Sequence, residues 1–166
     1  VHSAAISNTI ILTDAAGVHR QGIDEHLGEY DHNIQIRLLV GSIIPAQAHQ
    51  KAVKLRQVLR QQILDALEKV DVLVMPTSSI PASPIPTKAG IGSKQEVLDG
   101  LAGRRSFTAP FNVAHTPALP INRGFTSQNL PVGLQIAGKP FDEGTLFRVA
   151  HAYEQATDWH TRRPPI

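Results

Sequence analysis

The feature that most constrains the fold of this chain is a pair of short apolar runs separated by a polar insert. The runs are residues 116–121 and 130–136, and most residues between them are polar or glycine. This order is typical of two antiparallel strands joined by a wide hairpin loop. The runs contain Pro117, Pro120 and Pro131. Because proline cannot donate to a sheet ladder, we expect these residues at strand starts, bulges or an edge, with the hairpin at the rim of a larger sheet.

Composition excludes several classes of protein. The chain has 166 residues, 42% hydrophobic and 18% charged, which suits a single globular domain and not a disordered chain. Sixteen basic and fourteen acidic residues leave a net charge of +2, so we expect no nucleic-acid partner. Cysteine is absent, which excludes disulfides, thiolate metal sites and a cysteine nucleophile.

The ends and hydropathy of the chain suggest its location and origin. No apolar run approaches the roughly 20 residues of a membrane-spanning helix, so we expect no membrane partner and a cytoplasmic location. The sequence starts at Val1, without a methionine and directly before an expected helix. We therefore interpret it as a fragment of a longer domain.

Apolar spacing predicts several helices. Residues 3–19 favour a helix with Ser3 as its cap and Gly17 and Gly22 at its end, although the run TIIL leaves a strand open. A second helix is expected from Asp24 until Gly41 stops it.

The clearest helix runs from Pro45 to about Lys69, with one apolar stripe and with Arg60 on the solvent side. Asp142 is expected to cap a last helix whose inner face carries five side chains: Leu146, Val149, Ala150, Tyr153 and Ala156.

The long helix is followed by an expected strand. Residues 70–76 are β-branched and apolar and end at a proline, so we predict a buried strand, parallel to its neighbour because it comes directly off a helix. The proline-rich stretch that follows is expected to be a loop, and residues 94–101 a short helix.

Several spaced motifs around the hairpin resemble the C-terminal half of the amidase signature hydrolases. The most specific is the run LPVGLQIAG at residues 130–138, preceded by Phe107-Thr108, Asn112 and Pro117-Ala118. Further matches lie along the chain, at Asp14, Ala15, His19, Gly41, Ala52, Arg56, Asp71, Leu73, Pro76, Thr77, Ala150 and Glu154. The resemblance implies an α/β fold in which a mixed β-sheet is flanked by helices, and of which this chain is about the last third.

The catalytic groups that the resemblance implies are absent from this sequence. Enzymes of that family use a serine nucleophile, a second serine in a cis peptide and a lysine, all in the N-terminal half, with both serines in a Gly- and Ser-rich segment. Ser78 and Ser79 have no neighbouring glycine to shape an oxyanion site, so we interpret them as turn hydroxyls. The segment at residues 90–94 lacks phosphate-loop spacing. We expect this chain alone to be inactive.

A metal site is the alternative that the eight histidines raise. The densest group combines histidines and carboxylates within residues 24–32, but no HExxH or other ligand spacing is present. A solvated helix start, with acids favoured by the helix dipole, explains this group. We therefore expect no metal and no cofactor.

The resemblance places part of this chain on the wall of the substrate cleft, while Phe107 and Phe111 fit equally well in a core. We expect Asn112 to fix the turn before Pro117 by bonding backbone. The candidate pocket residues are Arg37, Arg105, Phe107, Thr108, Phe111, Asn112 and His115.

Four positions depart from the family pattern. Arg105 stands where the glutamine-using members of the family, the A subunits of glutamyl-tRNA amidotransferase, usually have an acidic residue that holds the amino group of glutamine. Because a cation cannot hold an ammonium group, a stand-alone amidase is favoured. His115 replaces a usual glycine, and its effect is either a reshaped pocket or a simple loop position. Asn122 and Asn129 also replace common glycines, and asparagine tolerates the left-handed conformation.

We therefore expect the C-terminal portion of an enzyme that cleaves a small carboxamide, together with a preceding segment that carries the catalytic residues. The alternatives are a non-catalytic binding domain on the same scaffold and the glutamine-hydrolysing component of glutamyl-tRNA amidotransferase. A fragment would expose apolar faces, so a homodimer is also possible.

Overall fold

The computed structural model describes residues 2–85 and 107–163 of the chain. The described residues form two compact units. The helical unit holds the residues up to Val58 and residues 84–85, and the sheet unit holds residues 59–83 and 107–163. The boundary falls inside the long helix α4 (Ala46–Leu67).

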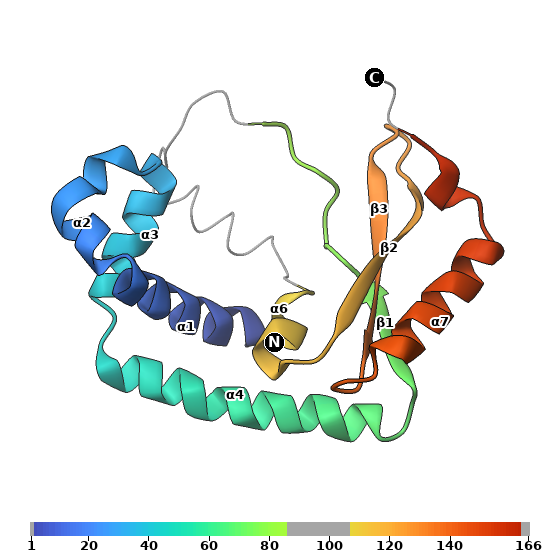
Figure 1. Cartoon of the computed structure of the whole chain (residues 1–166), viewed down its shortest axis with the longest axis horizontal. Coiled ribbons are helices and arrows are strands. Elements are labelled where there is room, and N and C mark those ends of the chain that lie inside the picture. Colours follow the sequence, from blue (N-terminus) through green and yellow to red (C-terminus); the bar gives the residue numbers. More distant parts are fainter. Residues whose placement is uncertain (1, 86–106, 164–166) are drawn as a thin grey trace. The chain divides into compact units, whose positions relative to one another are not determined.

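The helical unit is built from α1 (Ser3–Val18), α2 (Arg20–His26), the 3-10 turn η1 (Leu27–Glu29) and α3 (His32–Ser42), followed by the first half of α4 (Figure 1). The helix predicted for residues 3–19 is confirmed. His2 occupies the N-cap position, without a side-chain bond, so the capping role expected for Ser3 is wrong. Gly17 and Gly22 lie inside α1 and α2, where they end neither helix.

The single helix expected from Asp24 to Gly41 is wrong, because the chain turns at Tyr30. That residue is extended, and the Asp31 side chain then accepts a hydrogen bond from the Asn33 amide at 2.9 Å, which caps α3. Gly41 lies within α3, and a Cβ atom there would overlap the carbonyl oxygen of Leu12. Glycine is needed for the close approach of α1 and α3, and it does not stop the helix.

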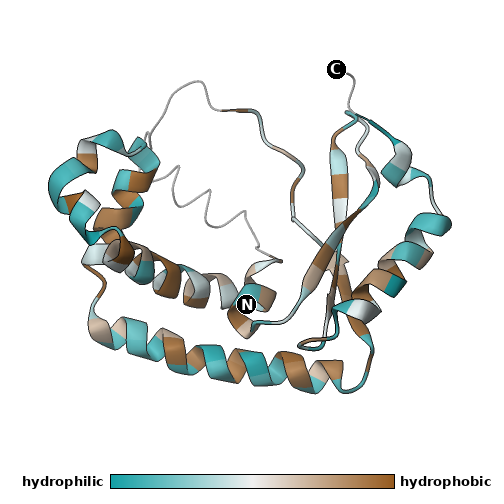
Figure 2. Ribbon diagram, viewed as in Figure 1, coloured by the Kyte–Doolittle hydropathy of each residue, from teal (hydrophilic) through white to brown (hydrophobic). Residues whose placement is uncertain are grey.

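The long helix predicted from Pro45 to about Lys69 is confirmed as α4. Figure 2 shows hydrophobic and hydrophilic residues alternating along it. The apolar stripe is only partly covered, since Ala52 is buried while Leu55 is exposed. No helix in residues 2–85 or 107–163 is long and apolar enough to cross a membrane.

The sheet unit contains three strands in the order β1-β3-β2, namely β1 (Val72–Pro76), β2 (Ala118–Phe125) and β3 (Pro131–Gly138) (Figure 1). The predicted hairpin is confirmed: β2 and β3 pair in antiparallel register, with Pro131 at a strand start and Pro120 on the edge strand β2.

The hairpin loop is narrower than predicted. Residues Asn122 to Gly124 lie in β2, because a β-bulge at this point lets the strand continue to Phe125. Within the bulge, the Asn122 side chain accepts a hydrogen bond from the Gly124 amide.

The parallel direction predicted for the strand at residues 70–76 is wrong. β1 pairs antiparallel with β3, from Val72 opposite Gly138 to Pro76 opposite Leu134. A preceding helix does not determine whether a strand runs parallel or antiparallel to its neighbour in the sheet when that neighbour, here β3, lies far along the chain. Within the described residues β1 is also an edge strand, and the Val74 side chain is 54% exposed, so the expected burial is wrong as well.

Helix α7 (Glu143–Gln155) covers one face of the sheet and completes the core. The core cluster joins Ile121 and Ile136 of the hairpin to Leu146 and Ala150 of α7. Four of the five side chains predicted for the inner face of α7 lie there, whereas Ala156 is the exposed residue that follows the helix. A short helix, α6 (Ala109–Ala114), was not predicted. The helix expected at residues 94–101 lies outside the described residues.

Candidate functional site

The two faces of the sheet differ in what they carry. Side chains alternate along a strand, so Leu134 and Ile136 face α7 while Gly133, Gln135 and Ala137 face the opposite side. This opposite side, the second face, carries small residues around one buried amide. Gln135 is only 4% exposed. A buried polar side chain of this kind requires a hydrogen-bond partner.

The partner of Gln135 is the start of a segment that runs from Phe107 to His115. The Gln135 side-chain nitrogen Nε2 donates to the Phe107 carbonyl oxygen at 3.0 Å. Because a carbonyl oxygen only accepts, the amide group must present its N–H to Phe107. The 107–115 segment is therefore attached to the central strand of the sheet.

The other end of the 107–115 segment is held by Arg60 of α4. Its guanidinium donates to the carbonyl oxygen of Ala114 and to that of His115, the latter at 3.3 Å. A cation beside the last carbonyls of a helix satisfies groups that have no partner within the helix. Arg60 is half-buried, so its expected place on the solvent side of α4 is wrong.

The structure brings together five of the seven candidate pocket residues on the 107–115 segment. Phe107 and Thr108 are half-buried, Phe111 is buried, and Asn112 and His115 are exposed. The burial of Phe111 agrees with the alternative interpretation that this side chain belongs to the hydrophobic core. Arg37 is exposed on α3 in the helical unit, and Arg105 lies outside the described residues. Whether any of these side chains meets a substrate stays a prediction.

Asn112 and His115 differ from what the sequence suggested. The Asn112 side chain makes no hydrogen bond with a described residue, and the turn before Pro117 is closed by backbone bonds: His115 donates to Asn112, and Thr116 to Phe111. His115 has φ 53° at the C-cap of α6. This left-handed backbone is one that glycine adopts most readily. Asn129 is left-handed as well, with φ 60°, whereas Asn122 is not among the residues with positive φ.

A cleft of about 640 Å³ opens beside the hairpin within the sheet unit. It is lined by residues 77–82 of the loop after β1 and by hairpin residues 120–122, 126 and 131–133. No charged side chain lines its described part. Pro120, which lines this cleft, is the register partner of Gln135, so the cleft borders the second face.

Gly133 and Thr77 form the base of this cleft. The Thr77 amide donates to the Gly133 carbonyl at 3.0 Å, and a Cβ atom on Gly133 would lie 2.6 Å from the Thr77 hydroxyl oxygen. Only glycine lets the loop lie this close to β3. The buried Thr77 hydroxyl has no hydrogen-bond partner among the described residues.

Ser78, in the loop after β1, does not resemble an activated nucleophile. The Ser78 hydroxyl donates to the Ile80 carbonyl at 2.8 Å and accepts from the Ile80 amide, so its predicted role as a turn hydroxyl is confirmed. Residues 90–94, weighed as a phosphate loop, lie outside the described residues.

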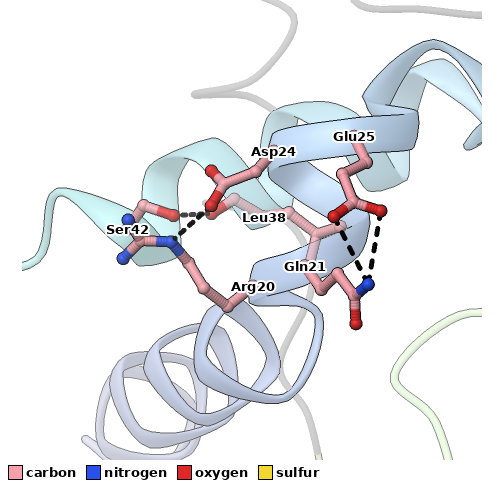
Figure 3. Close-up of polar contacts among 6 residues, drawn as sticks. All are labelled: Arg20, Gln21, Asp24, Glu25, Leu38 and Ser42. Atoms are coloured by element: carbon pink, nitrogen blue, oxygen red, sulfur yellow. Dashed lines mark hydrogen bonds and ion pairs between the residues drawn. The ribbon is translucent and has the colours of Figure 1, made fainter.

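The cluster of acids and histidines at residues 24–32 is engaged in local pairs, which Figure 3 shows in part. Arg20 pairs with Asp24 at 3.1 Å, and Gln21 donates to Glu25 at 3.3 Å. Asp24 and Glu25 lie in the last turn of α2, so the prediction that these acids belong to the start of a helix is wrong for them. Their pairing with side chains four residues earlier on the helix surface explains their positions instead. Within residues 2–85 and 107–163, no group of three or more such side chains is arranged to hold a metal ion.

Gln135 lies in the run that carries the family resemblance, but its contact with Phe107 was not predicted, and neither was the contact of Arg60 with Ala114. The available signal for Gln135 was a single amide inside an otherwise apolar strand pattern. Arg60 gave no signal, because a basic residue on a long amphipathic helix normally lies in solvent.

A family model described as Amidase matches residues 12–147. Curated proteins similar to the chain include the A subunit of glutamyl-tRNA(Gln) amidotransferase from Methanosarcina barkeri, 42% identical over 80% of this chain and 27% of that protein. The corresponding protein of Chloroflexus aggregans is 42% identical over 71% of this chain and 23% of that protein. The chain thus spans about a quarter of the length of these relatives.

Solved structures resemble the chain across most of its length. A crystal structure of an amidase superposes with a TM-score of 0.78 at 23% identity, covering 93% of this chain and 35% of the other. The glutamyl-tRNA(Gln) amidotransferase A subunit from Thermotoga maritima superposes with a TM-score of 0.60 at 27% identity, covering 93% and 33%. The likeness to the first shows the fold alone, and it confirms the expected α/β fold class.

Proposed function

This chain belongs to the amidase signature family, and from that premise we propose that it is the C-terminal portion of an enzyme that hydrolyses the C–N bond of a carboxamide. The proposed mechanism is the family's serine, cis-serine and lysine chemistry, carried by a segment outside this sequence. Two observations support it: the chain spans about a quarter of the length of its relatives, and the hydroxyl of its own Ser78 is engaged with the backbone of Ile80.

In this proposal the chain supplies one wall of the substrate cleft. The observation that carries the proposal is the 107–115 segment, held at one end by Gln135 and at the other by Arg60. Its exposed side chains, Asn112 and His115, are the ones proposed to face a substrate. For Arg37 and Arg105 a role in the pocket stays a proposal that rests on the family resemblance alone.

A second candidate is the glutamine-hydrolysing component of a glutamyl-tRNA amidotransferase. It is favoured by the names of the relatives, which are 42% identical to this chain. Arg105 argues against it, because a cation would repel the amino group of glutamine. The small-molecule amidase therefore remains the first proposal, in a cytoplasmic protein.

The complete gene product, with whatever precedes Val1, provides the test. We expect it to release ammonia from small carboxamides without tRNA. Ammonia release from glutamine that depends on charged tRNA would favour the amidotransferase. Absence of carboxamide hydrolysis in a folded complete protein would contradict the first proposal, and absence of both activities even with the other amidotransferase subunits present would favour a binding domain.

A further inference from the structure

Both ends of the 107–115 segment are fastened by side chains from elements distant in sequence. Gln135 comes from the central strand β3 and Arg60 from the helix α4, and each donates to backbone carbonyls. The helix between these points, α6, has only six residues. A helix this short is not stable by itself, so its position depends on what holds its ends.

Gln135 is the one polar side chain that β3 carries on the second face. Its neighbours there, Gly133 and Ala137, are small and apolar, and the space beside Gly133 is taken by Thr77 of the loop after β1. The contact between this face of β3 and the backbone of Phe107 is therefore made by the Gln135 amide.

We propose that Gln135 and Arg60 are positioning residues, which set the place of the substrate-facing segment without touching the substrate themselves. This inference rests on the proposed function. Gln135 fixes the start at Phe107, and Arg60 fixes the end at Ala114 and His115. With both ends fixed, α6 is held as a rigid body, and the geometry of Asn112 and His115 follows from it.

Hydrogen exchange tests the anchoring in this chain, without any substrate. Gln135→Met keeps the size of the side chain but removes the donor. We expect the amides of Phe111 and Asn112, which bond to the Thr108 carbonyl, to exchange about tenfold faster. The matched control is Gln128→Met at the exposed hairpin loop, which should leave them unchanged.

Arg60→Met tests the other end. The amides of His115 and Thr116, bonded to Asn112 and Phe111, should exchange about tenfold faster. Arg60→Lys, which keeps a cation near the carbonyls, should restore part of the protection. Arg123→Met, at an exposed position of β2, is the control.

A third readout separates positioning from general stability. In the complete enzyme, Gln135→Met and Arg60→Met should raise KM for the carboxamide about tenfold, with kcat within about twofold, because substrate contacts are lost while the nucleophile is untouched. Arg60→Lys should recover part of this loss.

Three results would overturn the proposal. One is unchanged exchange at both ends of the segment. Another is faster exchange spread equally over the β3 ladder, which would indicate loss of stability throughout the sheet unit. The last is faster local exchange with unchanged KM. A complete protein without any turnover would contradict the proposed function instead, and the exchange data would then decide the anchoring by themselves.

Discussion

The helical unit and the sheet unit of this chain differ in how their buried apolar side chains are joined. Both units leave large apolar side chains exposed: Val18 is 82% exposed in the helical unit and Phe141 is 96% exposed in the sheet unit. In the sheet unit, Ile136 and Leu146 are each 2% exposed and pack in one cluster across the hairpin and α7. In the helical unit the buried apolar side chains of α1 and α3, which pack closely at Gly41, are Ile6, Ala16 and Leu38. The sheet unit thus joins strands and a helix in one cluster, whereas the helical unit packs helix on helix.

The largest effect on stability is expected from a comparison of two leucine substitutions. Leu146→Ala in the core should destabilise the chain by about 2–5 kcal/mol, because it leaves a cavity against Ile136. Leu39→Ala on α3, where the side chain is exposed, should change stability by less than about 0.5 kcal/mol. Urea unfolding of both variants measures this, and equal losses would contradict the difference in burial between Leu146 and Leu39.

A second test asks whether the helical unit depends on a close approach. Gly41→Ala should cost about 1–3 kcal/mol, since the added methyl group meets the Leu12 carbonyl. Gly17→Ala, in α1 with open space around it, should instead stabilise the helix by about 0.5–1 kcal/mol. Circular dichroism at 222 nm during thermal unfolding should show shifts of opposite sign. Shifts of the same sign would mean that α1 and α3 are not packed at Gly41.

A third test concerns backbone strain in the sheet unit. His115→Gly should stabilise it by about 1 kcal/mol, because φ 53° is costly for any residue with a Cβ atom. His151→Gly, inside α7, should destabilise by about the same amount. Denaturant midpoints of the two variants provide the comparison, and a loss of stability in His115→Gly would show that its side chain contributes more than the backbone costs.

The smallest expected effect lies where the C-terminal turn meets the hairpin. The Arg162 guanidinium lies 4.6 Å from the ring centre of Trp159 and 5.5 Å from that of Phe125. Arg162→Met should cost about 0.5–1 kcal/mol and change the fluorescence of Trp159, the single tryptophan of the chain. The neighbouring Arg163→Met should change neither. An unchanged spectrum in Arg162→Met would exclude the contact.

Much of the fold followed from the sequence because its signals were local. The hairpin was marked by prolines and turn residues, and α4 by a continuous apolar stripe. The direction of β1 and the breaks around Tyr30 were not predictable in this way, because they depend on partners far along the chain or on competing caps. Gly41 was misread for the same reason: its role comes from the backbone of α1, which the local pattern does not show.

The site was less predictable than the fold. The 107–115 segment was found through family resemblance, yet the helix within it and the residues that hold it were not. Gln135 and Arg60 act through backbone carbonyls, and any residue type presents a carbonyl. Such contacts therefore leave no recognisable sequence pattern at the residues whose carbonyl groups accept the hydrogen bonds. The left-handed backbone at His115 was not predicted either, whereas that of Asn129 agrees with the tolerance of asparagine for this conformation.

The most direct measurement of the central claim is ammonia release from a carboxamide by the purified 166-residue chain, compared with that by the complete protein. If the chain forms only a wall of the site, the complete protein should be active and the chain alone should give no turnover. Turnover by the chain alone, abolished by replacing one of its own side chains such as Ser78, would contradict the claim.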